Sequence, residues 1–536
     1  MSQRLLEAET MDRGLAAVTG DATRLITLTL VHHPDAQRVG DRVRLPLLAH
    51  ARARVPIGRA EPLFRASALA APAPLLSPFV SRKPLWLEGL GDGAVRIDAT
   101  EAGSRVEVDG APLTRTLDVA AGALERGVVV QIGGHVVLLL HDEAQVERPR
   151  PSPLVDELII GGSDRIERVR AAIERAASDT ANVLVRGETG SGKELVAQAI
   201  HRASARRDRP FVAVNMAAVA PTLAGSTLFG HVRGAFSGAD QSHDGLFVRA
   251  HGGTLVLDEV GDTPPEVQAA LLRVLETGEV MPVGGRAARA VDVRVVAATD
   301  ADLDHDMAQR RFRAPLFYRL ATSEVSVPPL RERRADIGRL VVHFLAKELA
   351  ALGREALLRP ALTDESPWLQ ASLVARLALY DWPGNVRQLR SVCHALALAS
   401  ESPSGLPLDE LARLMPASSA PRPPSQDAAR TPDGPTPAAP AGGGRTPASI
   451  TPDELERALV AADYRLSVAA DHFGISRPSM NELVDRHPRL KRAQKLTDED
   501  VRAGQREAAR TGDPLWRVLQ VSERGLKQRM KELGLE

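Results

Sequence analysis

The stretch NVLVRGETGSGKELVAQAIHRA, residues 182–203, decides the fold of the central part of this chain. Its opening apolar run is typical of a buried parallel strand, and its closing residues have the spacing of a helix. Glycines between them let the backbone curl so that its amides and the helix N-terminus face a phosphate, and Lys193 adds a positive charge. The sequence therefore predicts a P-loop that binds ATP. The expected nucleotide contacts are Gly187, Glu188, Thr189, Gly190, Ser191, Gly192, Lys193 and Glu194.

A second apolar run ends in carboxylates, as a nucleotide site requires. Residues 254–259 read TLVLDE, about 65 residues beyond Lys193. Asp258 is expected to hold Mg²⁺, directly or through water, and Glu259 to polarise the attacking water. A plain glycine-rich turn and a solvated strand end are the alternatives at this level. Glu194 departs from the general P-loop motif, which has Ser or Thr there as a magnesium ligand.

Size and charge narrow the class of protein. The chain has 536 residues, too many for one hydrophobic core, so two to four domains are expected. Its 68 basic residues balance 68 acidic ones, so any contact with nucleic acid must come from a local surface. The single cysteine, Cys393, excludes an internal disulfide, and no stretch has the roughly 20 apolar residues of a membrane helix. We expect a soluble, cytoplasmic protein without a membrane contact.

Composition and periodicity divide the chain into parts. Alternating apolar runs and turns near the N-terminus are typical of a small antiparallel β-sandwich. Strands alternating with helix-length segments indicate an α/β domain in the middle, and a stretch rich in Pro, Ala, Ser and Gly separates it from helical sequence. The predicted parts are an N-terminal extension (1–21), the β-sandwich (22–146), a linker (147–155), the α/β domain (156–400, with a helical lid from about 335), a second linker (401–450) and a helical DNA-binding region (451–536).

Seven short blocks occur in one order across residues 156–400: GETGSGKE, LFGHVRGAFSGAD, GGTLVLDEVGD, VRVVAATD, FRAPLFYRL, VPPLRERRADI and WPGNVRQL. Together they resemble the central AAA+ domain of sigma-54-dependent transcriptional activators, the bacterial enhancer-binding proteins. The resemblance implies an ATPase that works as a homo-oligomeric ring of six subunits. It also implies two partners, the sigma-54 RNA polymerase holoenzyme and upstream enhancer DNA.

The same resemblance assigns roles to single residues. Arg313 and Arg319 match arginine fingers that reach the neighbouring subunit's nucleotide, and Arg387 matches a sensor in the lid. Asn215 matches the residue that restrains the catalytic glutamate. Asp300 replaces the usual sensor Asn, and because a carboxylate repels the γ-phosphate unless it is protonated or paired, we expect ATPase activity slower than is typical. The catalytic set is Lys193, Asp258, Glu259, Asn215, Asp300, Arg313, Arg319 and Arg387.

The block GAFSGA resembles the loop GAFTGA, with which such activators contact sigma-54. Small residues on both sides of one aromatic let it project on a mobile hairpin; the alternative is a turn whose Phe236 packs into the core. Ser237 replaces the Thr of the family, and Pro315, Gly225 and Thr227 are further departures from its pattern. The expected contact residues are Gly234, Ala235, Phe236, Ser237, Gly238 and Ala239.

The N-terminal part resembles a forkhead-associated domain, a β-sandwich that binds phosphothreonine peptides. The resemblance rests on residues 57–59, residues 80–82 and the closing run LERGVVVQIGGHVVLLL. It implies that Arg59, Ser81 and Arg82 donate hydrogen bonds to a phosphothreonine-bearing protein. Pro84 stands in place of a scaffolding His, and residues 103–105 lack the Asn that grips the peptide. A sandwich that only mediates protein contacts is the alternative.

The C-terminal part has the sequence pattern of a helix-turn-helix and resembles the Fis-type DNA-binding domain. A capping box begins at Thr451, and a turn at Gly474 leads to a second helix capped by Ser476. These features recur 46 residues later, at Thr497 and Ser522, which suggests a duplicated motif; an ordinary helical hairpin is the alternative. The residues expected to face DNA are Arg477, Ser479, Asn481, Arg524, Lys527 and Arg529.

Taken together, the parts predict a transcriptional activator that uses ATP and Mg²⁺ to open the sigma-54 promoter complex. Input is expected through the N-terminal sandwich, and DNA attachment through the C-terminus. Two other functions remain open. The first is a DNA-bound recruitment scaffold whose ATPase has decayed, which Asp300, Ser237 and Pro315 keep possible. The second is an AAA+ remodeller of another client.

Overall fold

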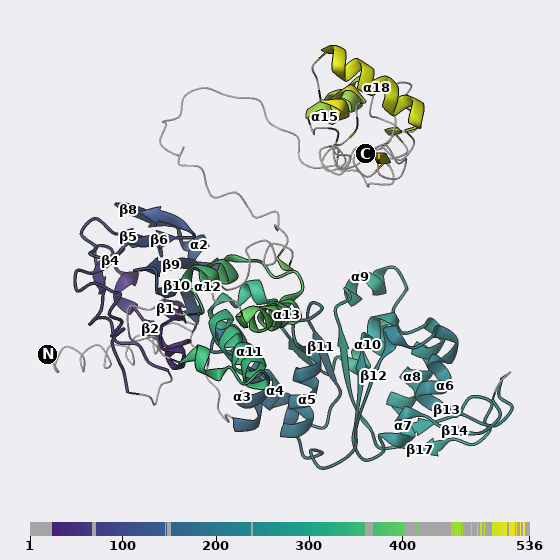
Figure 1. The fold of residues 1–536 in the computed structure, drawn as a ribbon. Coiled ribbons are helices and arrows are strands. Elements are labelled where there is room, and N and C mark those ends of the chain that lie inside the picture. The colour runs from purple at the N-terminus through teal and green to yellow at the C-terminus, as the bar shows by residue number, and fades with distance from the viewer. Residues whose placement is uncertain are drawn as a thin grey trace, which may run out of the picture. The chain divides into compact units, whose positions relative to one another are not determined.

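The computed structural model describes residues 24–66, 71–144, 146, 152–236, 239–359, 368–401 and 414–415, and parts of 452–530 (Figure 1). The chain forms two compact units, Met1–Arg422 and Pro423–Glu536. The first unit contains both the N-terminal strands and the α/β domain. No helix in the described parts is long and apolar enough to cross a membrane.

Residues 24–144, called the β-region below, form two antiparallel sheets around one hydrophobic core. The strand orders are β2-β1-β10-β9-β6-β7 and β3-β4-β5-β8. Apolar residues alternate along β4 and β5, so one face of each strand fills the core. The strands are β1 Arg24–His32, β2 Arg42–Arg44, β3 Arg54–Ile57, β4 Leu85–Gly89, β5 Val95–Asp98, β6 Val106–Val108, β7 Ala111–Leu113, β8 Thr116–Val119, β9 Val128–Ile132 and β10 Val136–Ala144, with α2 Ala121–Arg126 before β9.

The α/β domain has a five-stranded parallel sheet in the order β12-β15-β18-β11-β19. The central strands are short, continuous apolar runs because helices cover both faces. The α/β prediction is therefore confirmed. The strands are β11 Val183–Arg186, β12 Phe211–Asn215, β15 Thr254–Asp258, β18 Arg294–Thr299 and β19 Ser323–Ser326. The helices are α3 Pro153–Leu158, α4 Asp164–Ala177, α5 Lys193–Ala203, α6 Pro221–Phe229, α7 Leu246–Arg249, α8 Pro265–Thr277, α9 Leu303–Ala308 and α10 Ala314–Leu320.

A helical lid follows the sheet, as predicted. Its helices are α11 Ile337–Ala351, α12 Ala371–Leu379 and α13 Asn385–Leu398, which pack around the fully buried Trp382. One expectation about the first linker needs correction, because helix α3 begins at Pro153, inside the predicted linker 147–155. The β-region shares a hydrophobic cluster with the lid.

The second unit is helical where it is described, with α15 Pro452–Ala461, α18 Asp498–Thr511 and α19 Leu515–Val518. It has two small cores: Leu455, Phe473, Met480 and Val484 lie in one, and Val501, Leu519, Leu526 and Met530 lie in the other. Each member of the second set follows its counterpart by 46 residues (501 − 455, 519 − 473, 526 − 480, 530 − 484). The repeat seen in the sequence thus extends to the buried positions.

Candidate nucleotide site and its surroundings

The P-loop lies between β11 and α5, the strand-to-helix context that the sequence predicts. Gly190 and Gly192 have φ of 75° and 112°, backbone conformations that favour glycine. A Cβ on Gly190 would lie 2.5 Å from the carbonyl oxygen of Gly384 in the lid, so this glycine also permits close contact between loop and lid. Lys193 is buried, and its Nζ donates to the Gly187 carbonyl at 3.0 Å. The loop therefore has the curled backbone and the cation of a phosphate cradle.

The acidic end of β15 lies beside the P-loop. Glu259 Oε1 is 3.2 Å from Lys193 Nζ, and Glu259 Oε2 accepts a hydrogen bond of 3.1 Å from the Asp300 backbone N–H. Burial raises the pKa of Glu259 above its usual value, and the Asp300 charge adds to this rise, while Lys193 opposes it. A carboxyl group with a raised pKa is better suited to take a proton from water than an ordinary surface carboxylate.

Asn215 does not contact the residue that the sequence suggested. Its Nδ2 donates to Asp258 Oδ2 at 3.0 Å, whereas the expected partner was Glu259. The reason is strand register, because β12 pairs with β15 so that Asn215 lies opposite Asp258. Glu259 is one residue further along and has left the strand, with φ of 50°. In this structure, Asn215 therefore holds the expected magnesium ligand.

Asp300, at the end of β18, is turned toward the P-loop. Its carboxylate accepts a hydrogen bond from the Thr189 hydroxyl. This hydroxyl stabilises the Asp300 carboxylate by a hydrogen bond but leaves its negative charge in place beside the loop that binds phosphate.

The lid grips the P-loop through residues that sequence reasoning missed. Arg331 donates two hydrogen bonds to the Glu188 carboxylate, at 2.9 and 2.6 Å, and thereby lowers the pKa of Glu188. The buried Asn385 donates to Glu188 Oε2 and to the Thr189 carbonyl, both at 3.1 Å. Arg387, the expected sensor, donates its backbone N–H to the Gly190 carbonyl at 3.2 Å while its side chain is exposed. Lid and loop are thus directly linked.

A cavity of about 350 Å³ adjoins the P-loop, a volume within the usual range of small-molecule pockets. The P-loop residues Ser191 and Gly192 line it, and among the described residues the buried Ser191 Oγ has no hydrogen-bond partner. Ile159 and Ile160 form part of its apolar wall, and α11 and α13 contribute the lid side. The residues present therefore fit ATP. The short apolar run before Gly161 was the available sequence signal for this wall.

Of the two candidate arginine fingers, Arg313 directly precedes α10 and Arg319 lies in its last turn. Both side chains are exposed, and Arg319 Nε donates to the Leu275 carbonyl of α8 at 3.0 Å. The backbone N–H of Arg313 donates to Gln268 Oε1 at 3.0 Å, which fixes the start of α10. Pro315 lies in the first turn of this helix, where its missing N–H breaks no helical hydrogen bond. This departure from the family pattern is therefore compatible with the fold.

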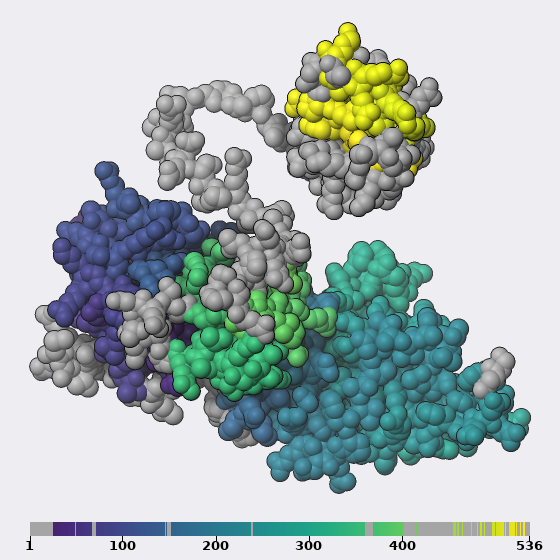
Figure 2. Space-filling view, viewed as in Figure 1, coloured from purple at the N-terminus to yellow at the C-terminus, as the bar shows by residue number. Residues whose placement is uncertain are grey.

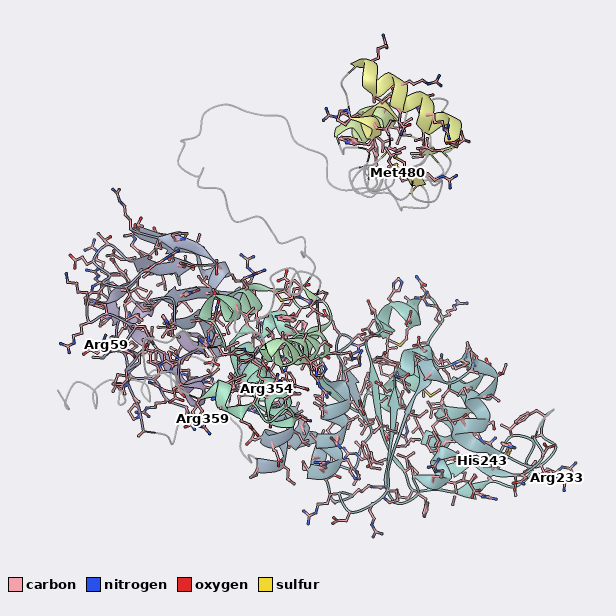
Figure 3. The ribbon with its side chains drawn as sticks, viewed as in Figure 1. Arg59, Arg233, His243, Arg354, Arg359 and Met480 are labelled. Carbon is pink, nitrogen blue, oxygen red and sulfur yellow. The ribbon has the colours of Figure 1, made fainter. Side chains whose placement is uncertain are left out.

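The GAFSGA block lies in a hairpin between β13 (Gly230–His231) and β14 (His243–Asp244). Figure 3 shows Arg233 on the part of this hairpin that projects from the domain. Phe236 is 38% exposed, so it does not pack into the core, although its ring lies 5.1 Å from that of His231. A second loop, between β16 (Glu279–Val280) and β17 (Arg289–Ala290), lies alongside: Val232 donates to the Val283 carbonyl at 3.1 Å. Ser237 and Gly238 lie outside the described residues.

Of the candidate phosphopeptide residues in the β-region, Arg59 contacts the segment that leads to Ser81 and Arg82. Arg59 donates to the main-chain carbonyls of Pro78 and Val80, at 2.7 and 2.8 Å, so it shapes the segment that carries Ser81. The Ser81 backbone N–H donates to Ser104 Oγ at 2.8 Å. Ser104 thus contacts the Ser81 segment from the stretch 103–105, which lacks the Asn of the forkhead-associated pattern. Sequence reasoning did not identify this contact. The Arg82 side chain is exposed.

The candidate DNA-facing residues lie mostly outside the described residues; this holds for Arg477, Ser479, Asn481, Arg524 and Lys527. Arg529 is described, and its Nε donates to the Leu496 carbonyl at 2.9 Å. This contact is within the second unit.

A parallel sheet, a P-loop gripped by a helical lid and an acidic strand end beside Lys193 define an AAA+ ATPase domain. Comparison with known proteins identifies its type: residues 159–326 match the Sigma-54 interaction domain, and residues 331–428 match the AAA+ ATPase lid domain. The chain therefore contains an ATP-binding AAA+ ATPase of the sigma-54 interaction type. The β-region and residues 429–536 lie outside these two matches.

The chain is also similar to known regulators. The DNA-binding transcriptional regulator NtrC of Escherichia coli strain K12 is 47% identical over 240 residues, 45% of this chain and 49% of NtrC. The C4-dicarboxylate transport transcriptional regulatory protein DctD of Rhizobium meliloti strain 1021 is 45% identical over 249 residues, 46% of this chain and 52% of DctD. The chain thus spans about half the length of these curated relatives. The solved structure of NtrX from Brucella abortus in complex with ADP is 30% identical, covers 62% of this chain and 70% of its own, and has a TM-score of 0.41.

Proposed function

We propose that this chain is a sigma-54-dependent transcriptional activator, in which ATP hydrolysis by a homo-oligomeric ring opens the promoter complex of sigma-54 RNA polymerase holoenzyme. One observation carries the proposal. The domain that holds Lys193 and Glu259 at a nucleotide site also presents the exposed Phe236 on a projecting hairpin. An ATPase site and a contact loop in one domain are the parts that a remodelling machine needs.

The proposed mechanism assigns each step to residues of this chain. The P-loop amides and Lys193 bind the phosphates, and Asp258 would hold Mg²⁺, which would supply positive charge against the phosphates. Glu259 orients the attacking water and takes its proton. Arg313 and Arg319 of one subunit complete the site of the next, which makes hydrolysis depend on ring assembly, as a hexamer. Asn385 and Arg387 pass the state of the P-loop to the lid.

The ends of the chain supply input and location. We propose that the β-region is a forkhead-associated domain whose Arg59, Ser81 and Arg82 bind a phosphothreonine-bearing protein. The second unit is proposed to be a duplicated Fis-type helix-turn-helix that binds upstream enhancer DNA, supported by the 46-residue offset between its two cores. Deleting residues 497–536 should weaken operator binding and reduce its salt dependence; unchanged affinity and slope would remove the second copy from the interface.

The decisive experiment is open-complex formation with purified sigma-54 holoenzyme on a supercoiled promoter. We expect open complexes with ATP and none with a non-hydrolysable analogue. Phe236→Ala should abolish open-complex formation and retain ATPase activity. Tyr318→Ala removes another exposed aromatic side chain, which is 72% accessible and lies on α10. This variant serves as the comparison, with ATPase activity as its primary readout.

Two rival functions predict different results. A recruitment scaffold with a decayed ATPase, the alternative suggested by Asp300, Ser237 and Pro315, would support transcription equally without hydrolysable ATP. A remodeller of another client would hydrolyse ATP in a ring and leave sigma-54 holoenzyme unchanged.

A further inference from the structure

The β-region is joined to the lid by an apolar face. Strands β9 and β10 are buried on both sides: one side fills the core between the two sheets, and the other packs against the lid. Val129, Val137 and Leu139 belong to the same cluster as Leu340 and Val341 of α11. Figure 2 shows the β-region (purple to blue) against the lid helices (green). The two parts therefore share a core, and a movement of one strains the other.

A polar contact extends this junction to the segment before α4. Arg42, on β2, donates to Glu143 Oε1 of β10 at 2.8 Å and also to the carbonyl oxygen of Gly162. Glu143 Oε1 accepts a second hydrogen bond, of 3.1 Å, from the backbone N–H of Asp164, the first residue of α4. The Glu143 side chain is only 2% exposed, so solvent screens these contacts little.

The lid contacts Gly162 and its neighbour Gly161 from the other side. The fully buried Asp336 accepts hydrogen bonds from the Gly162 N–H at 2.6 Å and the Ser163 N–H at 2.8 Å. Arg339 of α11 donates to the Gly161 carbonyl at 3.3 Å and to the Gly40 carbonyl of the β-region at 3.2 Å. A Cβ on Gly161 would lie 2.8 Å from the Asp336 carboxylate, so the packing leaves no room for a side chain.

This pair of glycines adjoins the nucleotide cavity. Gly161 directly follows Ile160, and Ile159 and Ile160 are part of the cavity wall beside the P-loop. A change at the Gly162 carbonyl is therefore passed along the backbone to the wall within two residues. Arg42 is the β-region side chain that contacts this carbonyl.

We propose that Arg42 is a positioning residue that couples the β-region to the nucleotide site. By holding Gly162 it fixes the Ile159–Ile160 wall, and it gives the β-region an energetic connection to nucleotide binding. The inference rests on the proposed ATPase function and goes beyond it, because it names the route by which the N-terminal part regulates that site. Coupling of this kind is reciprocal, so nucleotide binding must in turn alter the β-region.

The first test measures ADP affinity of the full chain by calorimetry. Arg42→Ala should weaken ADP binding about five- to tenfold, within the usual range of coupling between sites. Arg42→Lys, which keeps the charge, should restore part of the loss. The matched control is Arg44→Ala, an exposed residue on the same strand, which should bind ADP as the wild type does. Wild-type affinity in Arg42→Ala would overturn the proposal.

The second test uses a readout that a merely structural role would not move, and its first measurement needs only the wild-type chain. Hydrogen exchange of β1, β2 and β10 in the wild-type chain should slow when ADP is added, and this nucleotide-dependent protection should shrink in Arg42→Ala. If ADP binds but does not slow hydrogen exchange in the β-region, the coupling proposal is contradicted and the ATPase proposal is not. If the wild-type chain bound no ADP at all, the proposed ATPase function would fail first.

Discussion

The Thr189 hydroxyl donates a hydrogen bond to the Asp300 carboxylate, so the P-loop itself holds the negative charge at the expected sensor position. The backbone N–H of Asp300 donates to Glu259 at 3.1 Å, which places the same residue against the proposed general base. Asp300 therefore lies between the loop that binds phosphate and the carboxylate that activates water. Its charge should affect both.

Asp300→Asn should tighten ATP binding. The substitution removes a negative charge near the γ-phosphate, and because Asp300 is exposed, the gain should be modest, about 1 kcal/mol or roughly fivefold in Kd. ADP, which lacks that phosphate, should respond less. Asp304→Asn serves as the control, because it removes a nearby negative charge on a side chain that is 65% exposed. Equal effects of the two substitutions on ATP would show that Asp300 does not act locally.

The ATPase rate should fall as the pH is lowered, because Glu259 must be deprotonated to accept a proton. Its raised pKa puts this loss at a higher pH than an ordinary Glu would give. Since the Asp300 charge contributes to the rise, Asp300→Asn should shift the acidic limb to lower pH. The rate profile of kcat against pH measures this shift, and an unmoved limb would separate Asp300 from the base.

Gly338→Ala should destabilise the first unit, although Ala normally favours a helix. A Cβ at Gly338, in α11, would lie 2.2 Å from the Val31 carbonyl oxygen of β1, so the lid and the β-region would have to separate. Overpacking of this kind costs about 1–3 kcal/mol. Gly122→Ala is the matched control: Gly122 lies in α2 with nothing near its Cβ position, and there the change should be stabilising by about 0.5–1 kcal/mol. Denaturant unfolding of both variants measures the opposite signs.

Arg319→Ala should lower kcat by about 10³-fold or more while ATP binding persists, if Arg319 acts on the neighbouring subunit. A mixing experiment distinguishes this from a local effect. Lys193→Ala subunits keep Arg319 but have a defective P-loop, so they can complete the intact sites of Arg319→Ala subunits. The mixture should hydrolyse ATP faster than the two variants separately. No gain on mixing would argue that Arg319 acts elsewhere.

Much of the nucleotide site could be predicted because its signals are local. A glycine-rich turn between an apolar strand and a helix, and a strand that ends in Asp-Glu, each need only a few consecutive residues. A parallel sheet then places Lys193 beside Glu259, since the carboxyl ends of its strands lie on one edge. The contact of Asn215 was predicted wrongly because one residue of strand register decides whether its amide meets Asp258 or Glu259.

By itself the sequence determined the P-loop, the acidic strand end, the helical lid and the order of these parts, because short-range periodicity and turn chemistry encode them. Only the tertiary structure decided that the β-region packs on the lid, that Asp336 and Arg42 hold the same glycines, and that Asn385 grips the P-loop. These contacts join residues more than a hundred positions apart. Strands β9 and β10 are nearly continuous apolar runs because both of their faces are buried, but no local pattern specifies which helix covers the second face.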